Sequence, residues 1–192
     1  MFTLVDMKFL YALVIVSLFA FTGDDKKDLI LWSSAYKLQW QDFKGNVQGG
    51  STLKAMTWST IELETKKIDA NGIVLNISAS FIKNQSWRQK NFSDDFVLKH
   101  EQTHFDITEV YARKLRKKLS ETKFSSTKQA QQQIQSIYNE LFRESSGEQK
   151  KYDAETKHSI NKEEQEKWNK NIENELQSLN SFTTTEVNIR IK

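Results

Sequence analysis

The chain has 192 residues, the size of one domain with a single hydrophobic core. Apolar residues make up 38% and charged residues 28%, which excludes a disordered chain and predicts a globular protein with a polar surface. The net charge of +3 is too small to indicate a nucleic-acid partner, so we expect none. Cysteine is absent, so disulfides are excluded and any metal site must use His, Asp or Glu.

An apolar segment near the start, residues 9–21, follows Lys8 and carries no charge. Residues 24–28 (DDKKD) then turn abruptly polar, an order that predicts a secretory signal peptide over residues 1–23. The apolar run is shorter than the roughly 20 residues that a membrane span needs. We therefore expect an exported, periplasmic or extracellular protein whose mature domain covers 24–192 and has no stable membrane span. A retained N-terminal anchor or a buried N-terminal helix is the alternative.

Short apolar runs broken by Gly and Asn fill the chain from residue 29 to about 92, and they predict strands. Between Ile73 and Phe81, apolar side chains occupy every second position, which indicates a strand with one buried face. The region 57–63 alternates in a similar way, and Asn71-Gly72 between the two is a strong turn signal. The sequence therefore predicts a β-hairpin that belongs to a small mixed or antiparallel sheet.

From residue 93 onward the pattern becomes helical. Residues 93–95 (SDD) suit the N-cap of a helix that carries apolar residues on several sides, so we expect this helix to be central and largely buried. Residues 112–119 (ARKLRKKL) place five Lys and Arg at its negative end, where we expect them to be mostly solvated. Two further helices are predicted over 126–144 and 161–179, and a last strand over 183–192.

The motif HEQTH places two of the three histidines, His100 and His104, four residues apart on the first helix. At about 100° per residue they differ by about 40° around the axis, so both rings project from one side and can share one tetrahedral Zn²⁺. Glu101 follows the first histidine and can act as a general base for a water molecule at the metal. The same motif also occurs by chance, on helices that carry two surface imidazoles with no role.

Catalytic zinc usually has three protein ligands and one open position. The remaining histidine, His158, is the natural third ligand, although nothing in its spacing from His104 identifies it. It lies in a predicted loop between the second and third helices, and the nearby Asp153 and Glu155 are the alternatives. The five tryptophans are expected to lie in the core rather than to form a ligand platform.

Four segments give the chain a resemblance to the bacterial domain-of-unknown-function family 922, whose members are regarded as zinc-dependent peptidases of the zincin type. These segments are LQWQDFKG (38–45), SWRQK (86–90), LKHEQTHFDITEVYARKLRK (98–117) and YDAETKHSINKEEQEKWNK (152–170). They occur in the expected order and span most of the mature chain. HEQTHFDITE is the most specific of them, well beyond a bare H-E-x-x-H pattern.

The resemblance implies an α+β, zincin-like fold, in which a small sheet packs on a central metal-binding helix and two further helices complete the domain. It also suggests that Tyr152, Asp153, Thr156 and His158 gather near the metal. One departure is Ser159, where the resemblance leads us to expect glycine. It implies no cleavage specificity.

The combined expectation is an exported zinc metallohydrolase that acts on peptides or proteins. His100, His104 and His158 would hold Zn²⁺, Glu101 would act as the base, and Tyr152 would donate a hydrogen bond to the developing oxyanion or simply pack in the loop. Two alternatives remain. One is a non-catalytic zinc-binding or envelope partner-binding protein on the same scaffold. The other is an envelope-surface module that binds anionic polymers or lipid through the basic cluster 113–118, more weakly as salt rises.

Overall fold

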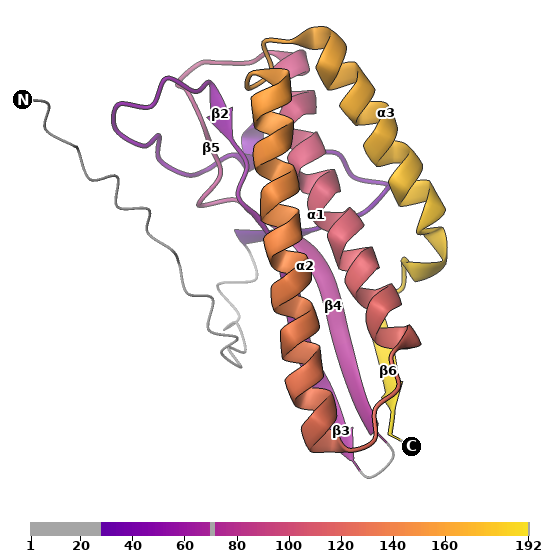
Figure 1. Cartoon of the computed structure of the whole chain (residues 1–192). Helices are drawn as coiled ribbons and strands as arrows, with labels where there is room; N and C mark the ends of the chain where they lie inside the picture. The colour runs from indigo at the N-terminus through magenta and orange to yellow at the C-terminus, as the bar shows by residue number, and fades with distance from the viewer. Residues whose placement is uncertain (1–27, 70–71, 192) are drawn as a thin grey trace, which may run out of the picture.

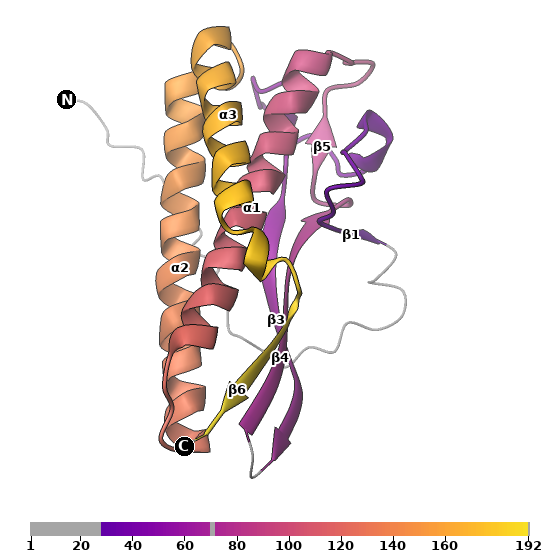
Figure 2. The same ribbon diagram turned by 90° about the vertical axis from the view of Figure 1, so that its right-hand side faces the viewer.

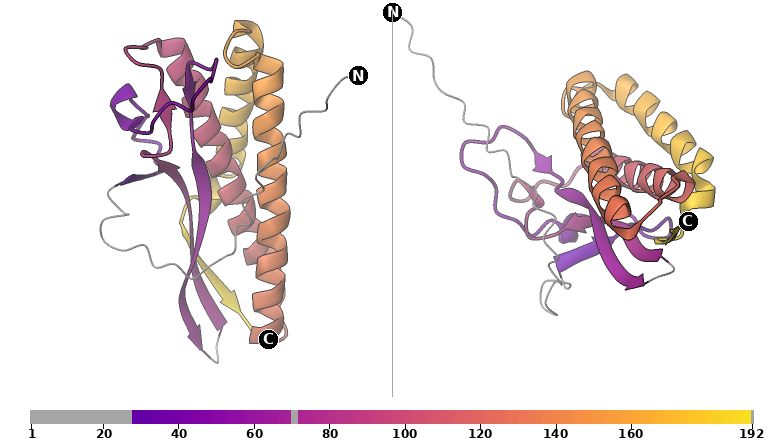
Figure 3. Two further views of the ribbon diagram at one scale, coloured as in Figure 1. Left: turned by 90° about the vertical axis from the view of Figure 1, so that its left-hand side faces the viewer. Right: turned by 60° about the horizontal axis from the view of Figure 1, so that its bottom comes forward.

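The computed structural model describes residues 28–69 and 72–191, and in this part of the chain the fold is α+β. Helices α1, α2 and α3 all lie on one face of the larger sheet (Figures 1 and 3). The strands are β1 (Leu29–Leu31), β2 (Ala55–Met56), β3 (Ser59–Asp69), β4 (Gly72–Ile82), β5 (Trp87–Arg88) and β6 (Glu186–Arg190). The helices are α1 (Asp95–Glu121), α2 (Thr127–Thr156), α3 (Lys162–Ser178) and the 3₁₀ turns η2 (Trp40–Asp42) and η3 (Asn180–Phe182).

Strand β4 forms the centre of the larger sheet, and its alternating apolar residues face the core, as predicted. It pairs antiparallel with β3 along one side, and with β1 and β6 on the other, so the predicted hairpin and final strand are confirmed. Gly72 opens β4 at φ +150°, where an added Cβ would lie 1.9 Å from the carbonyl oxygen of Ile189 in β6. Strands β2 and β5 form a separate antiparallel pair.

Helix α1 is the central element, and it lies between the sheet and the other two helices (Figure 2). Its N-cap is Asp94, whose side chain accepts hydrogen bonds from the backbone N–H groups of Phe96 and Val97. Apolar residues on several sides, such as Phe105, Ile107 and Leu115, are buried, so the prediction of a central, largely buried helix is confirmed.

Helix α2 runs antiparallel to α1 and continues 12 residues beyond the predicted end at residue 144 (Figure 1). The predicted loop between the second and third helices therefore begins later than expected, and Asp153 and Glu155 are helical rather than part of that loop. The weak helix formers between residues 145 and 147 do not stop the helix, because Ser145 is buried and the next two turns pack on α1 through Gln149 and Tyr152. Consequently Asp153 is held on a rigid helical turn that faces the start of α1.

Two arginines of the basic cluster 113–118 are buried, so the prediction that the cluster is mostly solvated is wrong for them. Arg113 and Arg116 are 4% and 2% exposed, and both bind the carboxylate of Glu109 at 2.8–3.1 Å. They also donate to the carbonyl oxygens of Leu176 and Phe182, which ties α1 to the segment around η3. A surface that binds anionic polymers would lose two of its five cations to this buried network.

The predicted signal peptide, residues 1–23, lies outside the described residues. Within the described part of the chain, no helix combines the length and apolar character that crossing a bilayer requires.

Candidate metal centre

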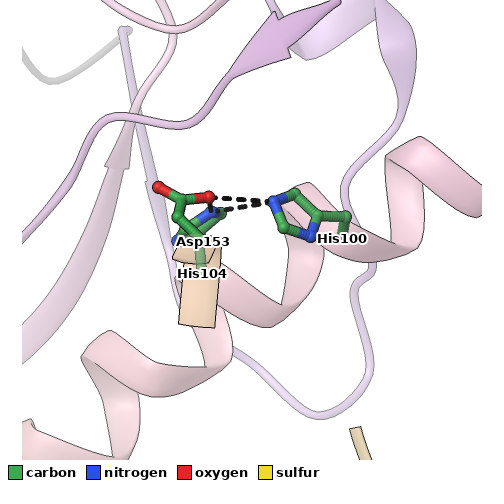
Figure 4. Close-up of side chains that lie close together, drawn as sticks. All are labelled: His100, His104 and Asp153. Atoms are coloured by element: carbon green, nitrogen blue, oxygen red, sulfur yellow. Dashed lines mark hydrogen bonds and ion pairs between the residues drawn. The ribbon is translucent and has the colours of Figure 1, made fainter. Parts of the chain in front are cut away.

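Three side-chain atoms converge where the start of α1 meets the end of α2 (Figure 4). The Nε2 atoms of His100 and His104 lie 3.2 Å apart, and Oδ1 of Asp153 lies 3.2 Å and 3.1 Å from them. A tetrahedral zinc ion with bonds of about 2.0–2.1 Å holds its ligand atoms about 3.3–3.4 Å apart. The three atoms therefore have nearly the spacing of one face of a metal coordination shell.

The other ring nitrogen of each histidine is bound to a glutamine amide. Nδ1 of His100 lies 3.1 Å from Oε1 of Gln165, whose Nε2 donates to the Phe96 carbonyl. Nδ1 of His104 lies 2.5 Å from Oε1 of Gln149, whose Nε2 donates to the carbonyl of His104 itself. Because a carbonyl can only accept, each amide must present its oxygen to the imidazole, and each Nδ1 must carry the proton.

This arrangement leaves both Nε2 atoms as acceptors in the neutral histidines. They face a third acceptor, the Asp153 carboxylate, in a site where His100 is only 3% exposed. Three lone pairs at this spacing repel one another unless a cation, either a proton or a metal ion, lies between them. Glutamine amides behind both histidines also match the outer-shell hydrogen bonds that orient metal-binding imidazoles in proteins. The residues therefore fit a divalent metal ion.

In the metal-free protein, the cation between the two histidines and Asp153 is a proton. Burial alone would lower the pKa of His104, but the hydrogen bond and charge of Asp153, with the charge of Glu101, raise that pKa above its ordinary value of 6.5. Burial alone would raise the pKa of Asp153, but hydrogen bonds from His100 and His104, with the charge of His158, hold that pKa far below 3.8. A metal ion would displace the proton.

For the metal-free protein, the free energy of unfolding of Asp153→Asn should differ from that of the wild type by an amount that depends on pH. The contribution of His104 to the free energy of unfolding is fully present below pH 6.5 and is lost as pH rises through its raised folded-state pKa. The contribution of Asp153 is present above pH 3.8 and is lost only in stronger acid. With a chelator present, urea unfolding should therefore show the largest loss in the variant between these two pH values, and a smaller loss at about pH 9. A loss that does not change with pH would contradict this account.

Glu101 points its carboxylate into the same region. It is 4% exposed, it lines the groove beside the two histidines, and its Oε2 has no hydrogen-bond partner among the residues that the structure describes. A buried carboxylate oxygen without a partner is costly in a domain that serves only as a scaffold. Its position one residue after a metal-ligand candidate suits a group that exchanges protons with a bound water or substrate.

Tyr152 lies behind the histidines rather than in front of them. Its ring stacks on His100 at 4.5 Å between centroids and contacts His104 edge-on at 4.9 Å. The side chain is fully buried, does not line the groove, and donates its hydroxyl to the carbonyl of His100 at 3.4 Å. Burial raises the pKa of this phenol far above 10, which keeps it neutral. The predicted hydrogen bond to an oxyanion has no geometric support, and Tyr152 is instead a positioning residue.

The three candidates for the third ligand occupy different places. Asp153 belongs to the group of atoms that lie within 4.8 Å of one another. Glu155 accepts a hydrogen bond from Nε1 of Trp168 at 2.8 Å and takes no part in this group. His158 also falls outside the group, but its Nδ1 lies 3.1 Å from Oδ1 of Asp153, and its side chain is 52% exposed. The geometry therefore favours Asp153 as the third ligand, with His158 as its partner.

A groove of about 1540 Å³ opens onto this centre. Its walls are the segment from Thr52 to Thr60, which includes β2, and one face of α2. Trp58 lines the groove and is 45% exposed, so the prediction that the tryptophans lie in the core is wrong for this residue. An opening of this size admits a ligand much larger than water.

Comparison with known proteins identifies the family of this chain. The model of one family, described as "Bacterial protein of unknown function (DUF922)", matches residues 30–159, which include every residue of the centre except Gln165. This chain belongs to the DUF922 family. No curated protein and no solved structure matches it.

In this DUF922 member, the loop that follows Asp153 is strained. Lys157, His158 and Ser159 adopt φ values of +49°, +50° and +71°, a left-handed conformation that costs non-glycine residues roughly 1–2 kcal/mol each. The glycine that the family resemblance led us to expect at position 159 would adopt this conformation without that cost. The serine instead leaves strain beside the metal centre.

Replacing Ser159 with glycine should therefore raise the free energy of unfolding by about 0.5–1 kcal/mol, because relief of the left-handed strain exceeds the extra entropy of glycine in the unfolded chain. Urea unfolding with a chelator present measures this change. Ser120→Gly, in the last turn of α1, is the matched control and should lower the free energy of unfolding. A loss of stability in Ser159→Gly would contradict the strain.

Sequence reasoning missed the two glutamines. Gln149 and Gln165 lie 45 and 65 residues from the histidines that they orient. Gln165 is fully buried and Gln149 partly buried, yet nothing in their local sequence distinguishes them from the many other glutamines of the chain. Only the packing of α2 and α3 against α1 brings these amides to the imidazoles.

Proposed function

We propose that this protein is an exported zinc-dependent hydrolase with a zincin-like fold, and that its substrates are peptides. One observation carries the proposal: two imidazole nitrogens and a carboxylate oxygen converge at 3.1–3.2 Å beside a groove that Glu101, whose buried Oε2 has no partner among the described residues, also lines. The zincin-like assignment is supported by α1, which carries the HEQTH pair and packs against an antiparallel sheet. Export is supported by the apolar segment 9–21.

His100, His104 and Asp153 would hold the metal. When bound there, zinc lowers the pKa of a water molecule toward about 7 and polarises the carbonyl group of a substrate. Gln165 and Gln149 hold the proton of each neutral imidazole on Nδ1, so that the two Nε2 atoms point at one place with free lone pairs.

Glu101 takes the proton from the attacking water at its unpaired Oε2 and later passes it to the amine that leaves. Burial keeps bulk water away from this carboxylate, and its position in the groove places it beside a bound substrate. Tyr152 fixes both imidazole rings from behind and exchanges no proton.

The test is metal-dependent hydrolysis by the full chain. The protein is stripped with a chelator, reloaded with zinc, and assayed on a pool of fluorogenic peptides. We expect activity to disappear on stripping and to return at about one zinc ion per chain. If the zinc-loaded protein binds the metal but cleaves no peptide in the pool, the non-catalytic zinc-binding alternative replaces the hydrolase.

A further inference from the structure

The charges of the groove are separated by sign. Its cations are Lys54 beside β2, Arg143 and Lys150 on α2, and Lys157 after α2. Its only carboxylates among the described residues are Glu101 and Asp153, and both belong to the metal centre. Beyond that centre, the walls therefore carry positive charge alone.

These four cations have no carboxylate partner within the described part of the chain. Each is exposed, and none of them takes part in the ion pairs there. Apart from Asp153, three acidic residues of α2 lie away from the groove. Glu148 and Glu155 line a small pocket beside α3, and Glu144 lies near Tyr111 of α1. Helix α2 thus presents Arg143 and Lys150 to the groove and these three acids to other sides.

The spacing along α2 sets the length of a ligand. Lys150 precedes Asp153 by three residues, or about 4.5 Å along the axis, and Arg143 precedes it by ten, or about 15 Å. An extended chain advances about 3.3 Å per residue, so about four residues separate the metal centre from Arg143. Apolar side chains also line the groove, among them Phe142, which precedes Arg143 on α2, and the exposed Trp58.

We propose that the groove selects acidic peptides. A carboxylate next to the scissile bond pairs with Lys150 and Lys157, a second carboxylate about four residues away pairs with Arg143, and apolar residues of the peptide contact Phe142 and Trp58. This inference rests on the proposed hydrolase function. A nucleic acid fits less well, because its phosphates would have to pass two carboxylates and a largely apolar wall.

The test uses fluorogenic peptides of one sequence that differ only in carrying two Glu, two Gln or two Lys residues at the positions described. Each exposed ion pair contributes about two- to fivefold, so kcat/KM for the Glu peptide should exceed that for the Gln peptide about tenfold, with the Lys peptide lowest. The preference should shrink as salt rises from about 50 mM to 500 mM.

The double variant Arg143→Gln/Lys150→Gln should reduce the preference to about twofold, because only Lys157 then remains to pair with the peptide, and it should lower kcat/KM for the Glu peptide far more than for the Gln peptide. Lys151→Gln is the matched control, since Lys151 is on the same helix but lies over the ring of Trp168, and it should keep the full preference. Equal cleavage of Glu and Gln peptides by the wild type would overturn the acidic preference while leaving the hydrolase intact.

Binding separates the two proposals. Fluorescence anisotropy of labelled Glu and Gln peptides with the zinc-loaded full chain reports the charge preference without turnover. Tighter binding of the Glu peptide without cleavage would support the acidic groove and reject the hydrolase. Binding of neither peptide, or tighter binding of a single-stranded oligonucleotide than of the Glu peptide, would overturn the acidic-peptide inference.

Discussion

Glu101→Gln is expected to reduce peptide hydrolysis by about a hundredfold or more while the protein keeps its zinc. A positioned general base contributes about 10²–10⁴-fold, and the glutamine amide cannot accept the proton. The change preserves the size of a side chain that is 4% exposed, so the fold and the ligand atoms of the neighbouring histidines should be unaffected. Steady-state kcat and the zinc content of the same preparation measure both parts of the prediction.

A matched control for Glu101→Gln is Glu144→Gln. Glu144 is exposed on α2 and does not line the groove, so the same chemical change there should leave hydrolysis at the wild-type rate. If Glu101→Gln hydrolyses peptides as fast as the wild type, Glu101 is not the base, even where zinc binding is intact. If the variant also loses zinc, Glu101 is required for zinc binding, and the loss of hydrolysis does not show that it transfers a proton.

Asp153→Ala is expected to weaken zinc binding by more than about a hundredfold, and His158→Ala by about tenfold. Loss of a partner in the outer shell typically costs 10–100-fold in metal affinity, and loss of a ligand costs more. Oδ1 of Asp153 lies within 3.2 Å of both Nε2 atoms, whereas His158 contacts only Asp153 within that group. Competition with a chromophoric zinc chelator gives both dissociation constants.

The reverse order of effects would exchange the roles of these two residues. If His158→Ala costs more than Asp153→Ala, the histidine of the strained loop is the third ligand and Asp153 supports it. His100→Ala serves as the reference for loss of a proposed histidine ligand, since its ring is buried at 3% exposure and its Nε2 lies 3.2 Å from Nε2 of His104. Asp153→Ala should match that reference within about tenfold.

Local patterns were enough to predict the first half of the centre. The spacing of His100 and His104 follows from helical geometry alone, and the cap at Asp94 fixes where that helix begins. The alternation along β4 predicted a strand with one buried face for the same reason, since side chains on a strand change face at every residue. Features with a period of two or four residues need no knowledge of distant contacts.

The rest of the centre, including Asp153, depends on contacts between segments that are distant in the sequence. Helix α2 continues through Ser145 and Gly147 because it packs on α1, and this extra length turns Asp153 toward the histidines. The burial of Arg116 depends on Glu109 together with a carbonyl 66 residues away. The orientation of Tyr152 likewise depends on distant contacts, since its ring packs on His100 of α1 and on Trp168 of α3.

Anomalous diffraction at the zinc absorption edge, from crystals of the zinc-loaded protein, tests the central claim most directly. We predict one peak at about 2.0–2.1 Å from Nε2 of His100, Nε2 of His104 and Oδ1 of Asp153. The carboxylate of Glu101 should lie beside it without coordinating the metal. Zinc bound elsewhere, or no zinc between these three atoms, would contradict the metal centre and the hydrolase that depends on it.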